Sequence, residues 1–337
     1  MTHRVAIAGI GADADLHADA VTAIDGAELV AGSCRTASKG EAFAAEYDAA
    51  WYEDTEAMLD EASPDVLVVC TPSGAHLEPT LAAAERGVHV LCEKPLEITT
   101  GRVDRMLDAA EDAGVRLGGV FQQRFDPGVQ ATQEAAADGR FGRFAVGTAT
   151  VPWWREDDYY RDAWQGTRDL DGGGALMNQS IHGVDALQWL AGTALDVPAD
   201  ENPVAEVTAY TDRLAHGDDL MEVEDTAVAA LRFRGGALGQ VLAATSMYPG
   251  SDKELRLGGR DGTVALTDDE VTTWQFRDER PIDDEVGGDD AGGGGAADPM
   301  SIGGGNHRRN VEAFLDAVET GDPFLLDGRE ARKAVEI

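Results

Sequence analysis

The sequence has 337 residues, of which 43% are hydrophobic, so it is long enough for two domains with a sizeable core. Its formal net charge is −36, from 63 acidic against 27 basic residues. A field of that sign repels nucleic acid and anionic membranes, and no apolar run approaches the ~20 residues that a membrane helix needs. Nucleic acid and membrane are therefore excluded as expected partners.

The acidic residues are spread along the chain, and only four residues are lysine. This usage is typical of a halophilic cytoplasmic protein, although an ordinary acidic enzyme is the alternative. The opening "MTHRVAIAGIG" enters a strand directly without a signal-peptide layout, so we expect a cytoplasmic location. Cys34, Cys70 and Cys92 have no metal-binding spacing, and we expect reduced thiols and no metal site.

The first 120 residues alternate short apolar runs with amphipathic runs. This alternation predicts a parallel, doubly wound α/β sheet, which binds its ligand at the carboxyl ends of its strands. We assign residues 1–122 to this domain. The predicted strands are "RVAIAG", "AELVAGS", "DVLVVC", "VHVLC" and "VRLGGVF", and the predicted helices include "GEAFAAEY", "TEAMLDEA", "LEPTLAAAERG" and "GRVDRMLDAAEDAG".

The pattern changes after Phe125, and we assign residues 123–337 to a second, α+β domain. Strand-like runs without long helices between them occupy residues 204–276, which predicts a large, open, mostly antiparallel sheet. The low-complexity stretch at about residues 281–305 predicts a mobile loop, and a last helix, "NHRRNVEAFLDAVETG", follows it.

A glycine-rich turn follows the first predicted strand. Gly9, Gly11 and Ala14 have G-x-G-x-x-A spacing between a strand and a helix. The first glycine permits a tight turn, the second lets the backbone approach a pyrophosphate, and the small alanine allows close helix–strand packing. A purely structural turn is the alternative. The predicted dinucleotide-binding turn comprises Gly9, Ile10, Gly11, Ala12, Asp13 and Ala14.

The second strand should end near Ser33, where an acid usually binds the hydroxyls of the adenosine ribose. This sequence has Cys34, Arg35 and Thr36 there instead. A missing carboxylate and a nearby guanidinium favour a 2′-phosphate, so we predict that NADP is preferred over NAD. The alternative is that Arg35 is only a solvated residue at the start of a helix.

Lys94 stands in "VLCEKP", at the carboxyl end of a predicted strand where a nicotinamide ring should lie. Partial burial lowers the pKa of a lysine toward a range useful for proton transfer, and arginine could not replace it because arginine does not deprotonate. A lysine kept here, in a chain nearly without lysine, indicates a chemical role. A structural ion pair with a neighbour such as Glu93 is the alternative.

A second group of polar residues follows three consecutive glycines in "GGGALMNQSIHGVDALQWL". Asn178, His182 and Asp185 have i, i+4, i+7 spacing, which places them on one face of a helix. Gly172–Gly174 would let the loop approach closely at the start of that helix. We predict a site here, although a lone helical histidine is most often only packed or solvated.

Together these motifs resemble the Gfo/Idh/MocA oxidoreductase family, named for glucose–fructose oxidoreductase and inositol dehydrogenase. The resemblance covers nearly the whole chain and rests on the order and spacing of several motifs. It implies a Rossmann domain, a C-terminal α/β domain whose open sheet often supports oligomer contacts, and hydride transfer between a nicotinamide and a sugar or polyol carbon. The motifs are "GIGADADLH", "TPSGAH" (residues 71–76), "CEKPL" (92–96), "QQRFDP" (122–127) and "WQGTRDLDGGGALMNQSIHGVDALQWLAG" (164–192).

The resemblance also implies roles for individual residues. Lys94 would be the lysine at the reacting hydroxyl, His182 its acid/base partner, and Asn178 would hold the substrate hydroxyl, although dehydrogenases of the family that act on polyols often have aspartate there. The cofactor would be bordered by Thr71, Pro72, His76, Glu93, Lys94 and Gln122. The candidates for lining the substrate pocket are Arg124, Trp154, Arg155, Tyr159, Tyr160, Trp164, Arg168 and Asp185.

The leading hypothesis is an NAD(P)-dependent dehydrogenase that acts on a secondary hydroxyl of a sugar, sugar derivative or polyol. The alternatives are an NAD-dependent glycosidase of the same family and a non-catalytic, sugar-sensing regulator on the same fold. We expect a homo-oligomer, a dimer or tetramer formed through the C-terminal sheet. Relatives usually continue through a last helix where this sequence reads "EARKAVEI", so we expect a shortened end.

Overall fold

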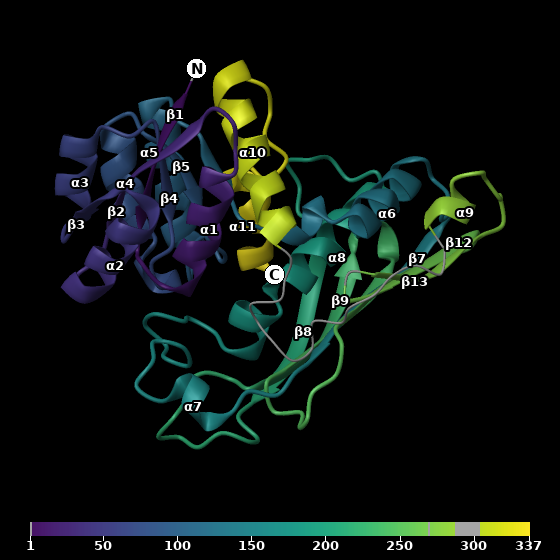
Figure 1. The fold of residues 1–337 in the computed structure, drawn as a ribbon. Coiled ribbons are helices and arrows are strands. Elements are labelled where there is room, and N and C mark those ends of the chain that lie inside the picture. The colour runs from purple at the N-terminus through teal and green to yellow at the C-terminus, as the bar shows by residue number, and fades with distance from the viewer. Residues whose placement is uncertain (1, 269, 287–303) are drawn as a thin grey trace. The chain divides into compact units, whose positions relative to one another are not determined.

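The computed structural model describes residues 2–268, 270–286 and 304–337, and the chain divides into two units that are treated separately below (Figure 1). The first unit contains the residues up to Gln122 together with the two C-terminal helices. The second unit begins at Gln123.

The first unit is built on a six-stranded parallel sheet in the order β3-β2-β1-β4-β5-β6. This order reverses direction beside β1, which is the doubly wound arrangement predicted from the sequence. Ala8 pairs with both Ser33 and Val69, and Val69 pairs with Cys92, so these four strands end at one level. The strands are β1 His3–Ala8, β2 Ala27–Ser33, β3 Ala50–Tyr52, β4 Val66–Val69, β5 His89–Cys92 and β6 Leu117–Gly119.

Helices surround this sheet, as Figure 1 shows. The central strands β1 and β4 are buried almost throughout because helices cover both faces, which explains their continuous apolar runs. Side-chain caps set two helix starts: Asp54 accepts a hydrogen bond from the Ala57 amide, and Thr99 accepts one from the Arg102 amide. The helices are α1 Ala12–Thr22, α2 Ala37–Tyr47, α3 Thr55–Ala62, η1 Ser73–Ala75, α4 Leu77–Glu85, α5 Thr100–Ala113, α10 Gly304–Thr320 and α11 Gly328–Glu336.

The position of α10 and α11 differs from the expected boundary, which placed residues 123–337 in the second domain. Helix α10 packs against α1 and β5, and α11 packs against α5 and β6. The rings of Phe314 and Phe324 lie 5.2 Å apart in this contact, and Phe314 is fully buried. The apolar faces of these helices therefore belong to the core of the first unit, although their sequence follows the second.

The second unit is built on a seven-stranded sheet in the order β13-β12-β11-β7-β10-β9-β8. All neighbouring pairs are antiparallel except β7 and β10, so the open, mostly antiparallel sheet predicted from the sequence is confirmed. The strands are β7 Phe144–Pro152, β8 Val204–Asp212, β9 Thr226–Phe233, β10 Leu238–Ala244, β11 Glu254–Gly259, β12 Gly262–Thr267 and β13 Glu270–Phe276.

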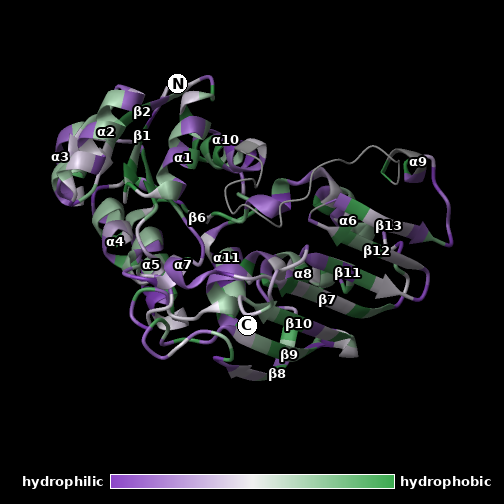
Figure 2. Ribbon diagram, turned by 60° about the horizontal axis from the view of Figure 1, so that its bottom comes forward, coloured by the Kyte–Doolittle hydropathy of each residue, from purple (hydrophilic) through white to green (hydrophobic). Residues whose placement is uncertain are grey.

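One face of this sheet is covered and the other is exposed. Buried and exposed residues alternate along β9 and β10, and Figure 2 shows the corresponding alternation of hydropathy along the strands. Leu187 and Leu190 of α8 join Leu231, Val241 and Leu257 of the sheet in the main core. The remaining helices are η2 Gln122–Phe125, α6 Pro127–Ala137, α7 Asp157–Tyr160, η3 Ala175–Gln179, α8 Ile181–Ala194, η4 Arg234–Gly236 and α9 Asp283–Val286.

The loop predicted at about residues 281–305 lies mostly outside the described residues, which omit 287–303. Its first residues form α9, where Asp283 pairs with Arg140 at 2.8 Å. Within the described ranges, no helix is long and apolar enough to cross a membrane, and no group of side chains could hold a metal ion. All three cysteines are free thiols.

Candidate active site

The glycine turn between β1 and α1 has the geometry that its sequence predicts. Gly9 has a φ of +94°, and a Cβ there would lie 2.6 Å from the Thr71 amide nitrogen, so only glycine fits. Gly11 precedes α1, and a Cβ on it would meet no atom within 4 Å. No side chain caps the N-terminus of α1, whose first N–H groups remain available to an anion.

The end of β2 carries no acid. Ser33 is buried, and its hydroxyl lies 2.9 Å from that of Thr55. Arg35 follows in an exposed position, and no residue in the described part of the chain forms an ion pair with it. Thr36 is the exposed residue before α2. An exposed, unengaged guanidinium is therefore present where an adenosine ribose would be bound in this fold.

The loops after β4 and β5 are joined by His76, which is buried. Its Nε2 lies 2.7 Å from the Thr71 carbonyl oxygen, and its Nδ1 lies 2.9 Å from the Pro95 carbonyl oxygen. Burial lowers the pKa of this imidazole. Both ring nitrogens face backbone carbonyl oxygens and the neutral ring donates to one of them, so His76 joins the two loops.

Lys94 lies just after β5, where it is half-buried. The preceding Glu93 is buried with both carboxylate oxygens in use: Oε1 is 2.8 Å from His17 Nε2, and Oε2 accepts a 3.0 Å hydrogen bond from the Lys94 amide. Burial opposes ionisation, but the hydrogen bond from His17 and the positive charge of Lys94 outweigh it, so the pKa of Glu93 lies well below its usual range. Glu93 is therefore an ionised carboxylate, and in this form it accepts the hydrogen bond from the Lys94 amide.

Several features of the first unit fit a dinucleotide. The space over Gly11 and the uncapped start of α1 suit a pyrophosphate. Pro72 precedes η1 directly after Thr71, whose hydroxyl donates to the Ala75 carbonyl, so this loop is fixed by its own hydrogen bonds. Gln122 is buried, and its Oε1 has no partner among the described residues, which leaves an acceptor for a ligand amide.

In the second unit the predicted single helix is divided in two. Ala175–Gln179 form a π-helical turn, and α8 begins only at Ile181. Asn178 and His182 therefore belong to two successive helical elements and not to the one continuous α-helix that the prediction assumed. The Asn178 amide nitrogen donates to Asp171, and its oxygen accepts a 2.9 Å hydrogen bond from Gln179. His182 is buried in the first turn of α8. π-Turns of this kind are frequent at functional sites.

Glu224 binds the backbone of the π-helical turn and accounts for the glycine directly before it. Its carboxylate accepts hydrogen bonds from the amides of Gly174 and Leu176, and its carbonyl accepts one from Ala175. A Cβ on Gly174 would lie 1.8 Å from the Glu224 carbonyl oxygen. The glycine at this position is therefore required by the close approach of the neighbouring chain.

Arg124 and Asp185, both expected to line the substrate pocket, form a buried ion pair instead. The Arg124 guanidinium donates from Nε at 2.7 Å and from Nη2 at 2.6 Å to the two oxygens of Asp185. Arg124 also lies over the ring of Trp189, 4.7 Å from its centroid. Because each satisfies the other below the surface, these two residues act as structural partners.

The predicted substrate residues between β7 and η3, many of them aromatic, have different partners. Arg155 donates through Nε and Nη2 to Gln179 and lies over the rings of Trp153 and Tyr159. The Tyr159 hydroxyl accepts a 2.9 Å hydrogen bond from Gln179, so this group adjoins Asn178. The other predicted residues have separate partners: Trp154 stacks on His216, Tyr160 is buried on Met221 and Val223, Trp164 is half-buried with its carbonyl bound to Thr167, and exposed Arg168 binds Glu222.

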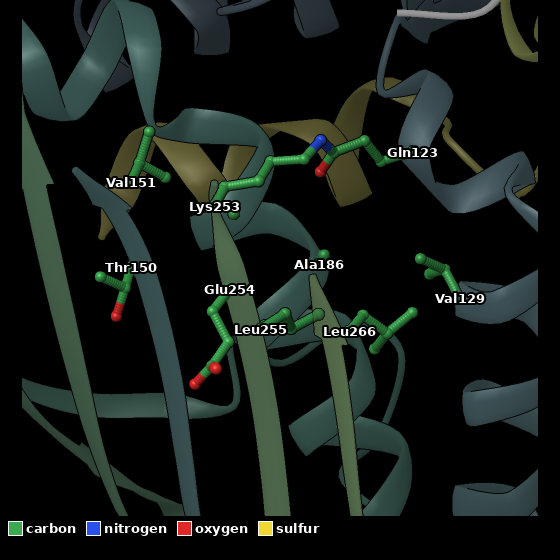
Figure 3. Close-up of a pocket in the computed structure, with 10 residues that line it drawn as sticks. Gln123, Val129, Thr150, Val151, Ala186, Lys253, Glu254, Leu255 and Leu266 are labelled. Atoms are coloured by element: carbon green, nitrogen blue, oxygen red, sulfur yellow. The ribbon is translucent and has the colours of Figure 1, made fainter. Parts of the chain in front are cut away.

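A small pocket in the second unit lies elsewhere. It has a volume of about 20 Å³, room for about one water molecule. Gln123, Gly183 and Lys253 are among its lining residues, and Figure 3 shows the Lys253 side chain extending toward Gln123. None of the predicted substrate residues lines it. This pocket is too small for a sugar and is a packing gap beside α8.

Both halves of the chain match models of known families. Residues 3–120 match the model described as an oxidoreductase family with an NAD-binding Rossmann fold, and residues 129–265 match the Gfo/Idh/MocA C-terminal domain. The chain belongs to the Gfo/Idh/MocA family. Its expected class, an oxidoreductase with a Rossmann domain that binds NAD, is confirmed by this membership.

Relatives of this Gfo/Idh/MocA protein include solved and curated dehydrogenases. The WlbA dehydrogenase from Bordetella pertussis, solved with NADH and UDP-GlcNAcA, is 32% identical with a TM-score of 0.88, over 99% of this chain and 92% of that chain. Myo-inositol 2-dehydrogenase of Thermotoga maritima is 26% identical over 98% of this chain and 93% of its own length. D-xylose 1-dehydrogenase (NADP(+)) 2 of Haloferax volcanii is 28% identical over 83% of this chain and 78% of its own length.

Some residues of this Gfo/Idh/MocA site were not singled out from the sequence. Asp171 and Glu224 reach Asn178 and its turn from seven and about fifty residues away, a distance at which no local spacing signals contact. Gln179 could have been found, since it stands directly beside Asn178. His17 could have been found as a lone histidine among alanines on the buried face of α1.

Proposed function

We propose that this protein is an NAD(P)-dependent dehydrogenase that oxidises a secondary hydroxyl of a sugar, sugar derivative or polyol, with Lys94 and His182 as acid and base. The observation that carries the proposal is the position of Lys94. It follows β5 at the strand-end level that β5 shares with the glycine turn after β1, and Glu93 fixes its backbone there. In a doubly wound sheet this edge is the ligand-binding edge.

The residues divide the chemistry as follows. A bound nicotinamide would supply the hydride acceptor for the carbon that bears the hydroxyl. Lys94 takes the hydroxyl proton as the carbonyl forms, directly or through His182, and the same groups return it in the reverse direction. Asn178, held by Asp171 and Gln179, presents its amide to the substrate hydroxyl. Positioning a bound substrate in this way contributes much of the rate enhancement of an enzyme.

The cofactor would be held by the first unit. The turn from Gly9 to Ala14 and the start of α1 would hold the pyrophosphate, and Gln122 and the Thr71 loop would border the nicotinamide. We further propose that NADP is preferred. Exposed Arg35 and the missing acid after β2 support this preference, and the name of the Haloferax relative specifies NADP(+). The WlbA structure holds NADH, so both cofactors occur among relatives.

Arg35→Asp should exchange the cofactor preference. A charge-assisted hydrogen bond to a phosphate is worth about 1.5–3 kcal/mol, so NADP affinity should fall ~10–100-fold while NAD affinity holds or improves. Fluorescence titration of both reduced cofactors measures this. Arg161→Asp, which makes the same charge change at an exposed site in the second unit, is the control. Unchanged affinities for both cofactors in Arg35→Asp would contradict the assignment.

The substrate class rests on the polar and aromatic group around Asn178. Arg155, Tyr159 and Gln179 offer a guanidinium, a hydroxyl and an amide beside rigid rings, which suits a ligand with many hydroxyls. A screen of aldoses, polyols and sugar acids with NAD and NADP tests this. Because acidic residues are so abundant, we propose a halophilic protein and expect turnover to rise in molar salt, where screening relieves self-repulsion. Absence of reduced cofactor with every substrate class would contradict the proposal.

We also propose that the exposed face of the second sheet binds a second copy of the chain. Cross-strand neighbours Leu238 and Val146 lie on this face with Val228 and Tyr210, and the exposed fractions of Tyr210 and Leu238 are 86% and 51%. Exposed apolar side chains that pair across the strands of a sheet face favour an interface there. Light scattering should give a mass of at least twice 35.6 kDa. A monomer at every concentration and salt level would overturn this assignment.

A further inference from the structure

The first unit contains a buried histidine that the proposed chemistry does not use. His17 lies on the inner face of α1 with none of its surface exposed. Its Nε2 is 2.8 Å from Glu93 Oε1, and because an ionised carboxylate only accepts, the imidazole is the donor. The other oxygen of Glu93 accepts the Lys94 amide. One carboxylate therefore joins the side chain of His17 to the backbone of Lys94.

A second buried histidine completes this arrangement. His307 of α10 packs edge-on against His17, with ring centroids 5.6 Å apart at 84°. Burial lowers the pKa of His307 to about 4, so at neutral pH it is an uncharged ring. The contact with His307 supports the His17 ring on the side that faces α10. Helix α10 thereby takes part in an arrangement built around the loop after β5.

Stability alone does not account for a histidine at position 17. Burying a polar group that is not fully hydrogen-bonded costs about 1–3 kcal/mol, and His17 Nδ1 is buried with no partner among the described residues. The neighbours on the same face are Ala14, Ala18, Ala20 and Val21, so an apolar side chain would suit the α1–α10 contact. Glu93 is likewise a buried charged residue. An apolar residue after β5 would not carry the desolvation cost of burying a charge.

We propose that His17 is a positioning residue for Lys94: by donating to Glu93 it fixes the carboxylate that holds the Lys94 backbone, and His307 steadies its ring. The inference rests on the proposed function for its catalytic consequence only. Loss of the His17 donor leaves Glu93 free to turn, and the Lys94 backbone loses a defined place. A displacement of about 1 Å at a reacting group can cost about a hundredfold in rate.

The test compares His17→Gln with His17→Asn. Both introduce the same amide, but only the longer glutamine can place its nitrogen where Nε2 lies. The prediction is that His17→Asn lowers kcat ~10–100-fold with the Kd for reduced cofactor within about threefold, and that His17→Gln recovers most of kcat. His307→Phe keeps an aromatic ring against His17 and should lower kcat by less than about threefold.

A second measurement does not depend on turnover. The chain has only four lysines, so amine labelling followed by peptide mass spectrometry reports each one. Lys94 should be labelled several-fold faster in His17→Asn than in the wild type or His17→Gln, while exposed Lys39 is unchanged.

The two readouts separate the possible failures. Equal kcat and equal Lys94 labelling in the glutamine and asparagine variants would overturn the positioning role, as would a loss confined to cofactor affinity. A changed labelling rate in a protein that oxidises no sugar or polyol would instead contradict the proposed function and leave the positioning of Lys94 supported. Thermal unfolding of each variant identifies any that does not fold. If His307→Phe does not fold, the comparison of His17→Gln with His17→Asn still tests the proposal.

Discussion

Replacing Lys94 with alanine should lower kcat ~10²–10⁴-fold, which is the range that a positioned general acid or base contributes. The reason is specific to the place: Lys94 follows β5 at the ligand edge of the sheet, and its backbone is held by Glu93. The Kd for reduced cofactor should stay within several-fold, because the glycine turn and the start of α1 are untouched. Steady-state kinetics and fluorescence titration measure the two effects.

Lys94→Arg is the matched control for this result. Arginine keeps the positive charge and the hydrogen-bond donors but does not release a proton at accessible pH. If Lys94 transfers a proton, the arginine variant should be nearly as inactive as alanine. If Lys94 serves only as a charge that orients the substrate, the arginine variant should retain substantial turnover, and the assigned acid/base role would be wrong.

Removing the carboxylate of Asp185 should destabilise the protein by about 3–5 kcal/mol, because Arg124 then remains buried without its partner. The two side chains are almost completely buried and joined by a bidentate contact. Urea unfolding of Asp185→Ala measures the loss of unfolding free energy. The substrate KM of the folded fraction should change little, since the pair is structural.

Two control variants distinguish a buried pair from a general effect of charge. Asp158→Ala breaks the exposed pair with Arg161 and should cost less than about 1 kcal/mol. The double variant Arg124→Met with Asp185→Leu replaces both charges with apolar groups and should recover much of the stability, since no buried charge is left alone. A double variant as unstable as Asp185→Ala would contradict this explanation.

Local pattern was sufficient for much of the fold. The run "AELVAGS" corresponds to β2 residue for residue, and the alternation of apolar and amphipathic runs predicts the parallel, doubly wound sheet that the structure shows. Strand β3 was missed because its three residues, Ala50–Tyr52, lack any periodic pattern. The return of α10 and α11 to the first unit was also missed, since an amphipathic helix specifies an apolar face but not the surface that covers it.

The candidate site was predictable where residues adjacent in the sequence determine the local backbone conformation. The glycine turn and the lysine after β5 depend on residues adjacent in the sequence, and both lie where the pattern places them. Partners distant in sequence were not predictable: Arg124 and Asp185 are 61 residues apart, and no local pattern indicates their buried ion pair. The single helix expected across Asn178 and His182 is divided, because Glu224 stabilises a π-helical turn that ends before α8 begins.

The central claim is tested most directly by a substrate deuterated at the carbon that bears the reacting hydroxyl. Using the best sugar or polyol from the screen, the measurement is the amount and isotopic content of the reduced nicotinamide formed. Hydride transfer predicts one reduced cofactor for each carbonyl product, with the deuterium on the nicotinamide ring. Release of a sugar fragment without net reduction of the cofactor, or a reduced cofactor free of deuterium, would contradict the account.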